Sequence, residues 1–182
     1  MTTEEYIDLK QRVGEAGYWH EIDWSENLQR CQAPCHFIRD YIFVVCNSGM
    51  KAQIARVIFN KVMQAVTRGY SASLEFGHPG KSAAIDRALV EGTEWFDFYQ
   101  TLGTDGLRLQ YLESLPWIGP ITKWHLAKNL GMDCAKPDRH LVRIAGSAEL
   151  AHELCRSLSE ATGDRIPTVD LVIWRAANLG WM

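Results

Sequence analysis

Glycine, proline and short polar breaks divide this chain into a series of helix-length segments. After the break at Asn47 to Gly49, apolar residues recur every three or four positions as far as Arg68, which is the spacing of one helix face. These positions are Ile54, Val57, Ile58, Val62 and Val66. Residues 37–45 are apolar and rich in β-branched and aromatic side chains, so propensity leaves helix and strand open there and only the context favours a helix. The pattern as a whole predicts an all-α protein.

Signals for helix starts and ends predict the other elements. Thr2 or Thr3, followed by two glutamates, is typical of an N-terminal cap and predicts a helix as far as Val13. A turn at 78–80 precedes a predicted helix over 81–90, and the aromatic residues at 95–99 are interpreted as core. Further helices are predicted over 105–114, 121–130, 138–145, 148–161 and 169–179, with Pro167 in the loop before the last one.

The length and composition fit a small globular protein. A chain of 182 residues makes one ordinary domain, or two small lobes that share a cleft. Apolar residues make up 47% and charged residues 23%, which is enough to bury a core and too little charge for a disordered chain. We expect residues 1–182 to form a single domain and a monomer.

The apolar runs are too short for a membrane span. The longest, at 41–46, is far below the roughly 18 to 20 residues that cross a bilayer. The first ten residues carry Glu4, Glu5 and Asp8 where a secretion signal would be basic and then apolar. We therefore expect an intracellular, cytoplasmic protein without a membrane partner.

The cysteines point to a reducing compartment. There are five of them at irregular spacing, so they cannot all be paired in a disulfide framework. Cys31, Cys35, His36 and Cys46 are residue types that bind zinc, but their spacing favours buried thiols and a capping histidine. We expect neither a metal nor a cofactor.

The charge is unevenly distributed. The net charge of −3 argues against avid nonspecific DNA binding, since lysine and arginine contacts to phosphate supply most of that affinity. Five basic residues nevertheless fall within 21 positions: Lys123, Lys128, Lys136, Arg139 and Arg143. A basic face on an acidic protein is therefore compatible with the sequence.

The segment Leu115-Pro116-Trp117-Ile118-Gly119-Pro120-Ile121-Thr122 joins two predicted helices, within a helix-hairpin-helix unit over about 105–131. A hairpin glycine lets backbone amides approach a DNA phosphate, and the start of the next helix presents N–H groups and a positive dipole end. Such a unit holds the DNA backbone without reading its sequence. A second segment, Lys136-Pro137-Asp138-Arg139-His140, begins a loop and basic helix over 136–145.

Together these segments resemble the helix-hairpin-helix DNA glycosylase superfamily, which includes endonuclease III and the oxoguanine and alkylpurine glycosylases. That family has Leu-Pro-Gly-hydrophobic-Gly, a helix, and then Val-Asp-x-His. The matching residues here are Leu115, Pro116, Ile118, Gly119, Asp138, His140 and Arg143. The resemblance is strongest over 105–145, and 37–66 resembles the family's early helices more weakly. It implies an all-α fold of two helical lobes around a cleft.

The resemblance implies that Asp138 is the catalytic residue. In the family this aspartate stabilises positive charge as the glycosidic bond breaks, and it can orient or deprotonate water. A fixed carboxylate in a dry cleft stabilises such a cation selectively, because the charge develops only in the transition state.

Two departures from the family pattern change the expected chemistry. Ile121 occupies the position of the amine nucleophile in members that also cleave the strand, and Lys123 lies about 200° further around the helix. Trp117 replaces the first hairpin glycine, and Pro120 removes a backbone donor. We expect a monofunctional glycosylase that uses water, with Trp117 packing under the hairpin or contacting DNA. The iron-sulfur ligand run of endonuclease III is absent from the sequence.

The remaining candidates are DNA-contact and base-pocket residues. The expected DNA contacts are Trp117, Gly119, Ile121, Thr122, Lys123, Lys128, Arg139 and His140. The expected base-pocket residues are Asn47, Ser48, Met50 and Gln53, with helix capping by residues 47–49 as the alternative. His140 capping a helix and Arg139 pairing with an acid also stay open. Lys81 is interpreted as solvated, with a phosphate contact as the alternative. Asp170, Trp174 and Arg175 are interpreted as core packing with one surface pair, with a place in the cleft as the alternative.

Three functions follow from the resemblance. The first is base-excision repair by hydrolysis of the bond between an abnormal base and deoxyribose. The second is a transferase like those of phage DNA hypermodification, which would replace pyrophosphate on a 5-methylene of thymine with an amine or amino-acid co-substrate, in the host cytoplasm. The third is a non-catalytic DNA-binding module. DNA is the expected partner in all three.

Overall fold

The structure is a computed structural model that describes residues 1–182, and its regular secondary structure is entirely helical. The prediction of an all-α fold is therefore confirmed. The chain forms two compact units, which are described separately. We call Met1–Arg30 with Gly131–Met182 the terminal unit, and Cys31–Leu130 the middle unit. None of the helices is both long enough and apolar enough to cross a lipid bilayer.

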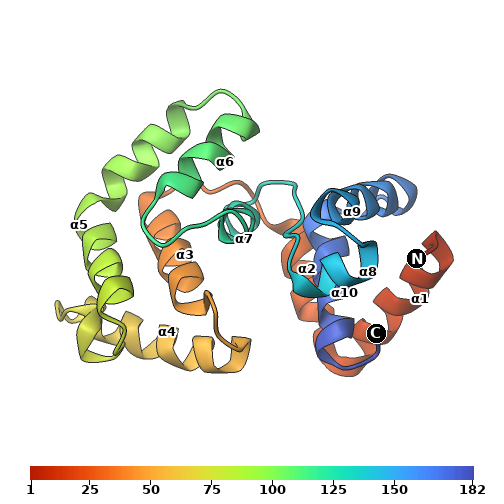
Figure 1. Ribbon diagram of the computed structural model, residues 1–182, viewed down its shortest axis with the longest axis horizontal. Helices are drawn as coiled ribbons and strands as arrows, with labels where there is room; N and C mark the ends of the chain where they lie inside the picture. Colours follow the sequence, from red (N-terminus) through yellow and green to blue (C-terminus); the bar gives the residue numbers. More distant parts are fainter. The chain divides into compact units, whose positions relative to one another are not determined.

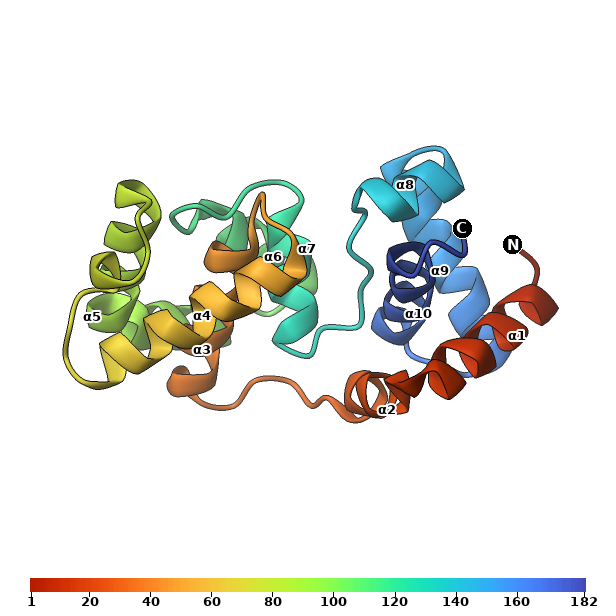
Figure 2. The same cartoon turned by 90° about the horizontal axis from the view of Figure 1, so that it is seen from below.

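The terminal unit is built around its last helix. Its elements are α1 (Thr3–Val13), a π-helical turn (Gly14–Tyr18), α2 (Trp19–Asn27), α8 (Arg139–Ala145), α9 (Ala148–Thr162) and α10 (Ile166–Asn178). Helix α10 contacts α1, α2, α8 and α9 (Figure 1). It can do so because it is apolar on nearly every side, with Val169, Val172 and Ile173 fully buried. Both chain ends belong to this unit (Figure 2).

The middle unit is built around its first helix. Its elements are α3 (Pro34–Asn47), α4 (Ala52–Thr67), a 3₁₀ turn (Ala72–Leu74), α5 (Pro79–Thr101), α6 (Asp105–Ser114) and α7 (Thr122–Asn129). Helix α3 packs against α4, α5 and α7 (Figure 1). The ambiguous apolar stretch 37–45 therefore forms a helix, as its context predicts.

Several predicted boundaries hold closely. The first helix has a capping box in which the Thr2 hydroxyl accepts from the Glu5 N–H and Glu5 bonds back to the Thr2 N–H. Helix α6 spans the predicted residues 105–114. Helix α10 starts three residues earlier than predicted, because Pro167 lies in its first turn, where a missing N–H costs nothing.

One expectation about packing and one about a helix boundary are wrong. On α4, Ile54 and Val57 are more than half exposed, and the buried face instead carries Ala55, Phe59, Val62 and Ala65. The apolar stripe of α4 is wider than the surface that covers it, so Phe59 and Val62 face the core together with two alanines, while Ile54 and Val57 face solvent. The predicted helix 81–90 and the aromatic segment after it form one continuous helix, α5.

Candidate functional site

Asp138 lies at the start of α8 in the terminal unit and caps that helix. Its Oδ1 accepts hydrogen bonds from the backbone N–H groups of His140, at 2.9 Å, and Leu141, at 3.1 Å. Its Oδ2 accepts no hydrogen bond from the chain, and the residue is partly exposed. One carboxylate oxygen is thus used to fix the side chain, and the other remains available to a ligand.

A buried carboxylate on α10 holds the loop that carries Asp138. Asp170 of α10 is only 2% exposed, and its Oδ2 accepts the backbone N–H of Lys136 at 2.9 Å. Lys136 in turn accepts the N–H of Asp138 at 2.7 Å, across the buried Pro137. Sequence reasoning assigned Asp170 to core packing and missed this contact; the signal was one aspartate inside the apolar run Thr168–Ile173.

His152 of α9 lies in the electrostatic field of Asp170. Burial lowers the pKa of His152, while the carboxylates of Asp170 and Glu149 act in the opposite direction and raise it. The buried Asp170 therefore has both a backbone donor and a titratable neighbour.

The basic residues after Asp138 lie on the surface of the terminal unit. Arg139 is exposed, and its Nε lies 3.4 Å from Nε2 of His140. Arg143 donates to the backbone oxygen of Met182 at 2.9 Å. Further along, Arg175 forms a double ion pair with Glu21, at 2.5 Å for the shorter contact, and stacks on Tyr18. The predicted pairing of Arg175 is therefore confirmed, but its expected place on the surface is wrong, since the two side chains are only 17% and 19% exposed.

The hairpin of the middle unit uses several of its own backbone donors. The N–H of Ile118 bonds to the Leu115 oxygen at 3.1 Å, and the N–H of Gly119 bonds to Thr122 Oγ1 at 2.7 Å. Pro120 has no N–H. The N–H groups of Trp117, Ile121 and Thr122 make no hydrogen bond within the chain, so they are available to an anion, and the last two lie at the start of α7.

Trp117 has an unusual backbone for a large residue. Its φ is +61°, in the left-handed region that normally selects glycine, and it is the only non-glycine residue of the chain with a positive φ. In the sequence motif that residues 115–119 resemble, this position is the first hairpin glycine. The side chain is 47% exposed and lies against the first turn of α5.

Position 121, just before α7, carries an isoleucine, and the two lysines of α7 lie further along the chain. Ile121 is 42% exposed, at the position where the resemblance would put an amine. Lys123 forms an ion pair with Glu113 of α6, with Nζ and Oε2 2.5 Å apart. Lys128, in the last turn of α7, is partly buried.

The predicted base-pocket residues form the end of α3 and the turn after it. Asn47 is the last residue of α3 and Ser48 is its C-cap, while Met50 is partly buried and Gln53 is exposed on α4. The alternative in which residues 47–49 cap the next helix is wrong, because the N-cap of α4 is Lys51 and no side chain caps it.

Lys81 is not the solvated lysine that the sequence suggested. It is 5% exposed, and its Nζ donates to the Ser48 backbone oxygen at 2.6 Å. Burial lowers the pKa of Lys81. A cation at this place stabilises the C-terminal end of α3, and it holds the turn that contains the predicted base-pocket residues.

No group of three or more histidine, cysteine or acidic side chains is placed to hold a metal ion. Of the four residues considered for zinc, Cys46 is fully buried in the core while Cys35 is exposed. These side chains are therefore not gathered around one point.

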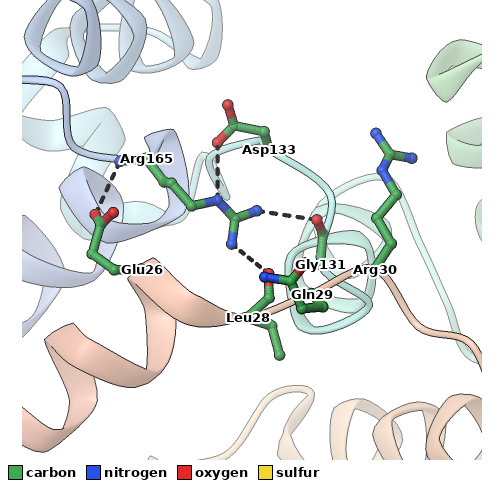
Figure 3. Close-up of a pocket in the computed structure, with 7 residues that line it drawn as sticks. All are labelled: Glu26, Leu28, Gln29, Arg30, Gly131, Asp133 and Arg165. Carbon is green, nitrogen blue, oxygen red and sulfur yellow. Dashed lines mark hydrogen bonds and ion pairs between the residues drawn. The ribbon is translucent and has the colours of Figure 1, made fainter.

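A pocket in the terminal unit was not predicted from the sequence (Figure 3). Arg165 crosses it, donating to the backbone oxygens of Leu28, at 2.7 Å, and Gly131, at 3.1 Å. The backbone N–H of Arg165 also binds Glu26, and its Nε lies 3.9 Å from Asp133. These contacts of Arg165 tie together three chain segments, around Leu28, Gly131 and Arg165.

Comparison with known proteins supports the fold. No protein-family model and no curated protein sequence matches the chain. Among solved structures, the chain is similar to the 8-oxoguanine glycosylase/lyase of Methanocaldococcus jannaschii, crystallised with a 15mer DNA that contains 8-oxoguanine. The TM-score is 0.69 at 15% sequence identity, over 96% of this chain and 97% of that one. The chain therefore has the fold of this helical DNA glycosylase.

Proposed function

We propose that this protein binds DNA and removes one of its bases by water-dependent glycosidic cleavage, with Asp138 as the catalytic carboxylate. The observation that carries the proposal is the state of Asp138: one oxygen is fixed by two backbone N–H groups, and the other has no partner in the chain. The fold of a DNA glycosylase, with a partly open helical hairpin in the middle unit, supports it.

The chemistry is a simple displacement. The bond between the base and the sugar C1′ breaks with its electron pair leaving on the base, and C1′ develops oxocarbenium character. The free oxygen of Asp138 stabilises that charge and orients a water molecule, which adds to C1′ as this carboxylate takes its proton. The departing base takes up one proton from solvent, and Asp138 returns its own to solvent, so that the carboxylate is regenerated. The products are a free base and an abasic site in an unbroken strand. The isoleucine at position 121 cannot form a Schiff base, which is why no strand cleavage is expected.

The DNA contacts follow from the donors that remain available. We assign backbone contacts to the N–H groups of Ile121 and Thr122, and the turn Asn47–Met50 to the extruded base. The other proposed DNA contacts are Trp117, Gly119, Lys123, Lys128, Arg139 and His140. Lys123 would exchange its ion pair with Glu113 for a phosphate.

The test uses duplex and single-stranded oligonucleotides that carry 8-oxoguanine, uracil, alkylated bases or 5-hydroxymethylated pyrimidines. We expect a free base and an alkali-labile site from one of them. Asp138→Asn should abolish the product while keeping the fold, since asparagine also caps helices. Asp23→Asn removes an exposed carboxylate of the same unit and should leave the rate unchanged.

Three outcomes would count against the proposal. An Asp138→Asn variant with full activity would remove the catalytic assignment. A product whose mass has gained an amine would identify the transferase instead, provided an amine or amino acid was present. Tight DNA binding without any product on the whole panel would identify a binding module.

A further inference from the structure

The hairpin carries a fixed aromatic surface that the proposed phosphate contacts do not use. The ring of Trp117 lies 4.8 Å from that of His78, centroid to centroid, with the two planes at 82°. His78 is itself held, because its Nδ1 accepts the backbone N–H of Lys81 at 3.4 Å. The indole is therefore supported from α5 rather than projecting freely.

Gly80 makes room for this ring. A Cβ atom at position 80 would lie 2.5 Å from Cζ2 of Trp117 and 3.3 Å from its Nε1, so any other residue would displace the indole. Trp117 also keeps a positive φ, a conformation that is strained for a large residue. Two features thus fix the position of the ring: the backbone conformation of Trp117 itself, and the space left by Gly80 on α5.

Despite this support, the indole is not buried. Trp117 is 47% exposed, and its Nε1 donates no hydrogen bond within the chain. Two other apolar side chains of the hairpin, Pro120 and Ile121, are exposed as well. The surface formed by Trp117, Pro120 and Ile121 is aromatic and apolar.

The same hairpin has few backbone N–H groups and little free positive charge left for a phosphate. The N–H groups of Ile118 and Gly119 are used internally, Pro120 has none, and the charge of Lys123 is paired with Glu113. A hairpin suited only to phosphate would need those donors and that charge. An exposed, rigid indole suits a different part of DNA, the flat face of a base that is not paired.

We propose that Trp117, backed by His78 and Gly80, is a stacking platform for an unpaired nucleobase of the bound strand. The inference rests on the proposed function insofar as DNA is the ligand. It deepens that function by giving the protein a preference for DNA with an unpaired or single-stranded position beside the target.

The experiment measures binding by fluorescence anisotropy on three labelled DNAs of equal length: a perfect duplex, a duplex with one unpaired base, and a single strand. The unchanged chain should bind the two unpaired DNAs more tightly than the perfect duplex. Trp117→Gly restores the residue that its backbone angle favours, so the variant should fold. It should bind the unpaired DNAs about tenfold more weakly, and the perfect duplex within a factor of two.

Two further variants separate stacking from packing. Trp117→Phe keeps an aromatic face and should retain most of the affinity, whereas Trp117→Leu keeps an apolar side chain and the backbone strain and should behave like the glycine variant. Thermal unfolding of each variant is measured alongside. The salt dependence of binding should not change, since no phosphate contact is removed.

The proposal is overturned if the unchanged chain shows no preference for unpaired DNA. It is also overturned if the leucine variant binds the unpaired DNAs as well as the phenylalanine variant does. The same holds if Trp117→Gly weakens binding to all three DNAs by the same factor. In either case the indole serves only in packing. Any of these results leaves the role of Asp138 intact, because base release is measured separately on the Asp138→Asn variant. Absence of DNA binding by the unchanged chain would instead refute both proposals.

Discussion

The buried carboxylate of Asp170 lies 2.9 Å from the backbone nitrogen of Lys136, two residues before Asp138. The helix at the centre of the terminal unit therefore holds the loop that presents the proposed catalytic side chain. Asp170→Ala leaves the partly buried N–H of Lys136 without its acceptor and a cavity in the core, which should lower the free energy of unfolding by about 1 to 3 kcal/mol.

The same substitution should reduce base release by more than its effect on folding. We expect a lower kcat at a temperature where the variant is still fully folded, since Asp138 would be held less firmly. Asp170→Asn keeps an acceptor oxygen, so its kcat and its stability should lie between those of the unchanged chain and those of Asp170→Ala. If Asp170→Ala lowers the stability but leaves kcat unchanged, Asp170 has a structural role only. Urea denaturation and single-turnover rates provide the measurements.

Asp40 of α3 should make stability depend on pH. Burial raises the pKa of Asp40 to about 6, and the charges of Arg39 and His36 only partly oppose the shift. The folded chain therefore holds a proton that the unfolded chain releases near pH 4. The contribution of this group to stability is consequently present at low pH and is lost as the pH rises towards 6.

Asp40→Asn removes this dependence. We expect the variant to be more stable than the unchanged chain at pH 7.5, by about 1 to 3 kcal/mol, and to lose that advantage near pH 4. Urea denaturation at both pH values measures the difference. Asp97→Asn, at an exposed position of the same unit, serves as the control. If the pH dependence of stability changes equally in Asp40→Asn and Asp97→Asn, the assignment to Asp40 is wrong.

Gly131 should tolerate no side chain. Its φ is +82°, and a Cβ atom there would lie 2.3 Å from the backbone oxygen of Gln29. Gly131→Ala should therefore lower the free energy of unfolding by several times the roughly 1 kcal/mol typical of a positive φ alone. Gly163, with a φ of +80° and nothing within 4 Å, provides the matched control. Similar unfolding midpoints for the two alanine variants would exclude the close contact with Gln29.

The sequence by itself determined the helical fold and most helix boundaries. Helical spacing, capping residues and breakers are local, and they act on the chain wherever it lies, as the capping box at Thr2 and the helix 105–114 illustrate. The motif around Asp138 and the missing amine at Ile121 were equally visible, because they depend on residue identity and spacing alone.

The partners of those residues were decided only by the tertiary structure. The burial of Lys81 on the Ser48 oxygen, the support of the Asp138 loop by Asp170 and the packing of Trp117 on Gly80 each join residues more than 30 positions apart in the chain. A propensity or a periodicity reports on one segment at a time, whereas these contacts depend on which faces of different helices meet. For the same reason the sequence identified the apolar stripe of α4 but not which of its residues face the core.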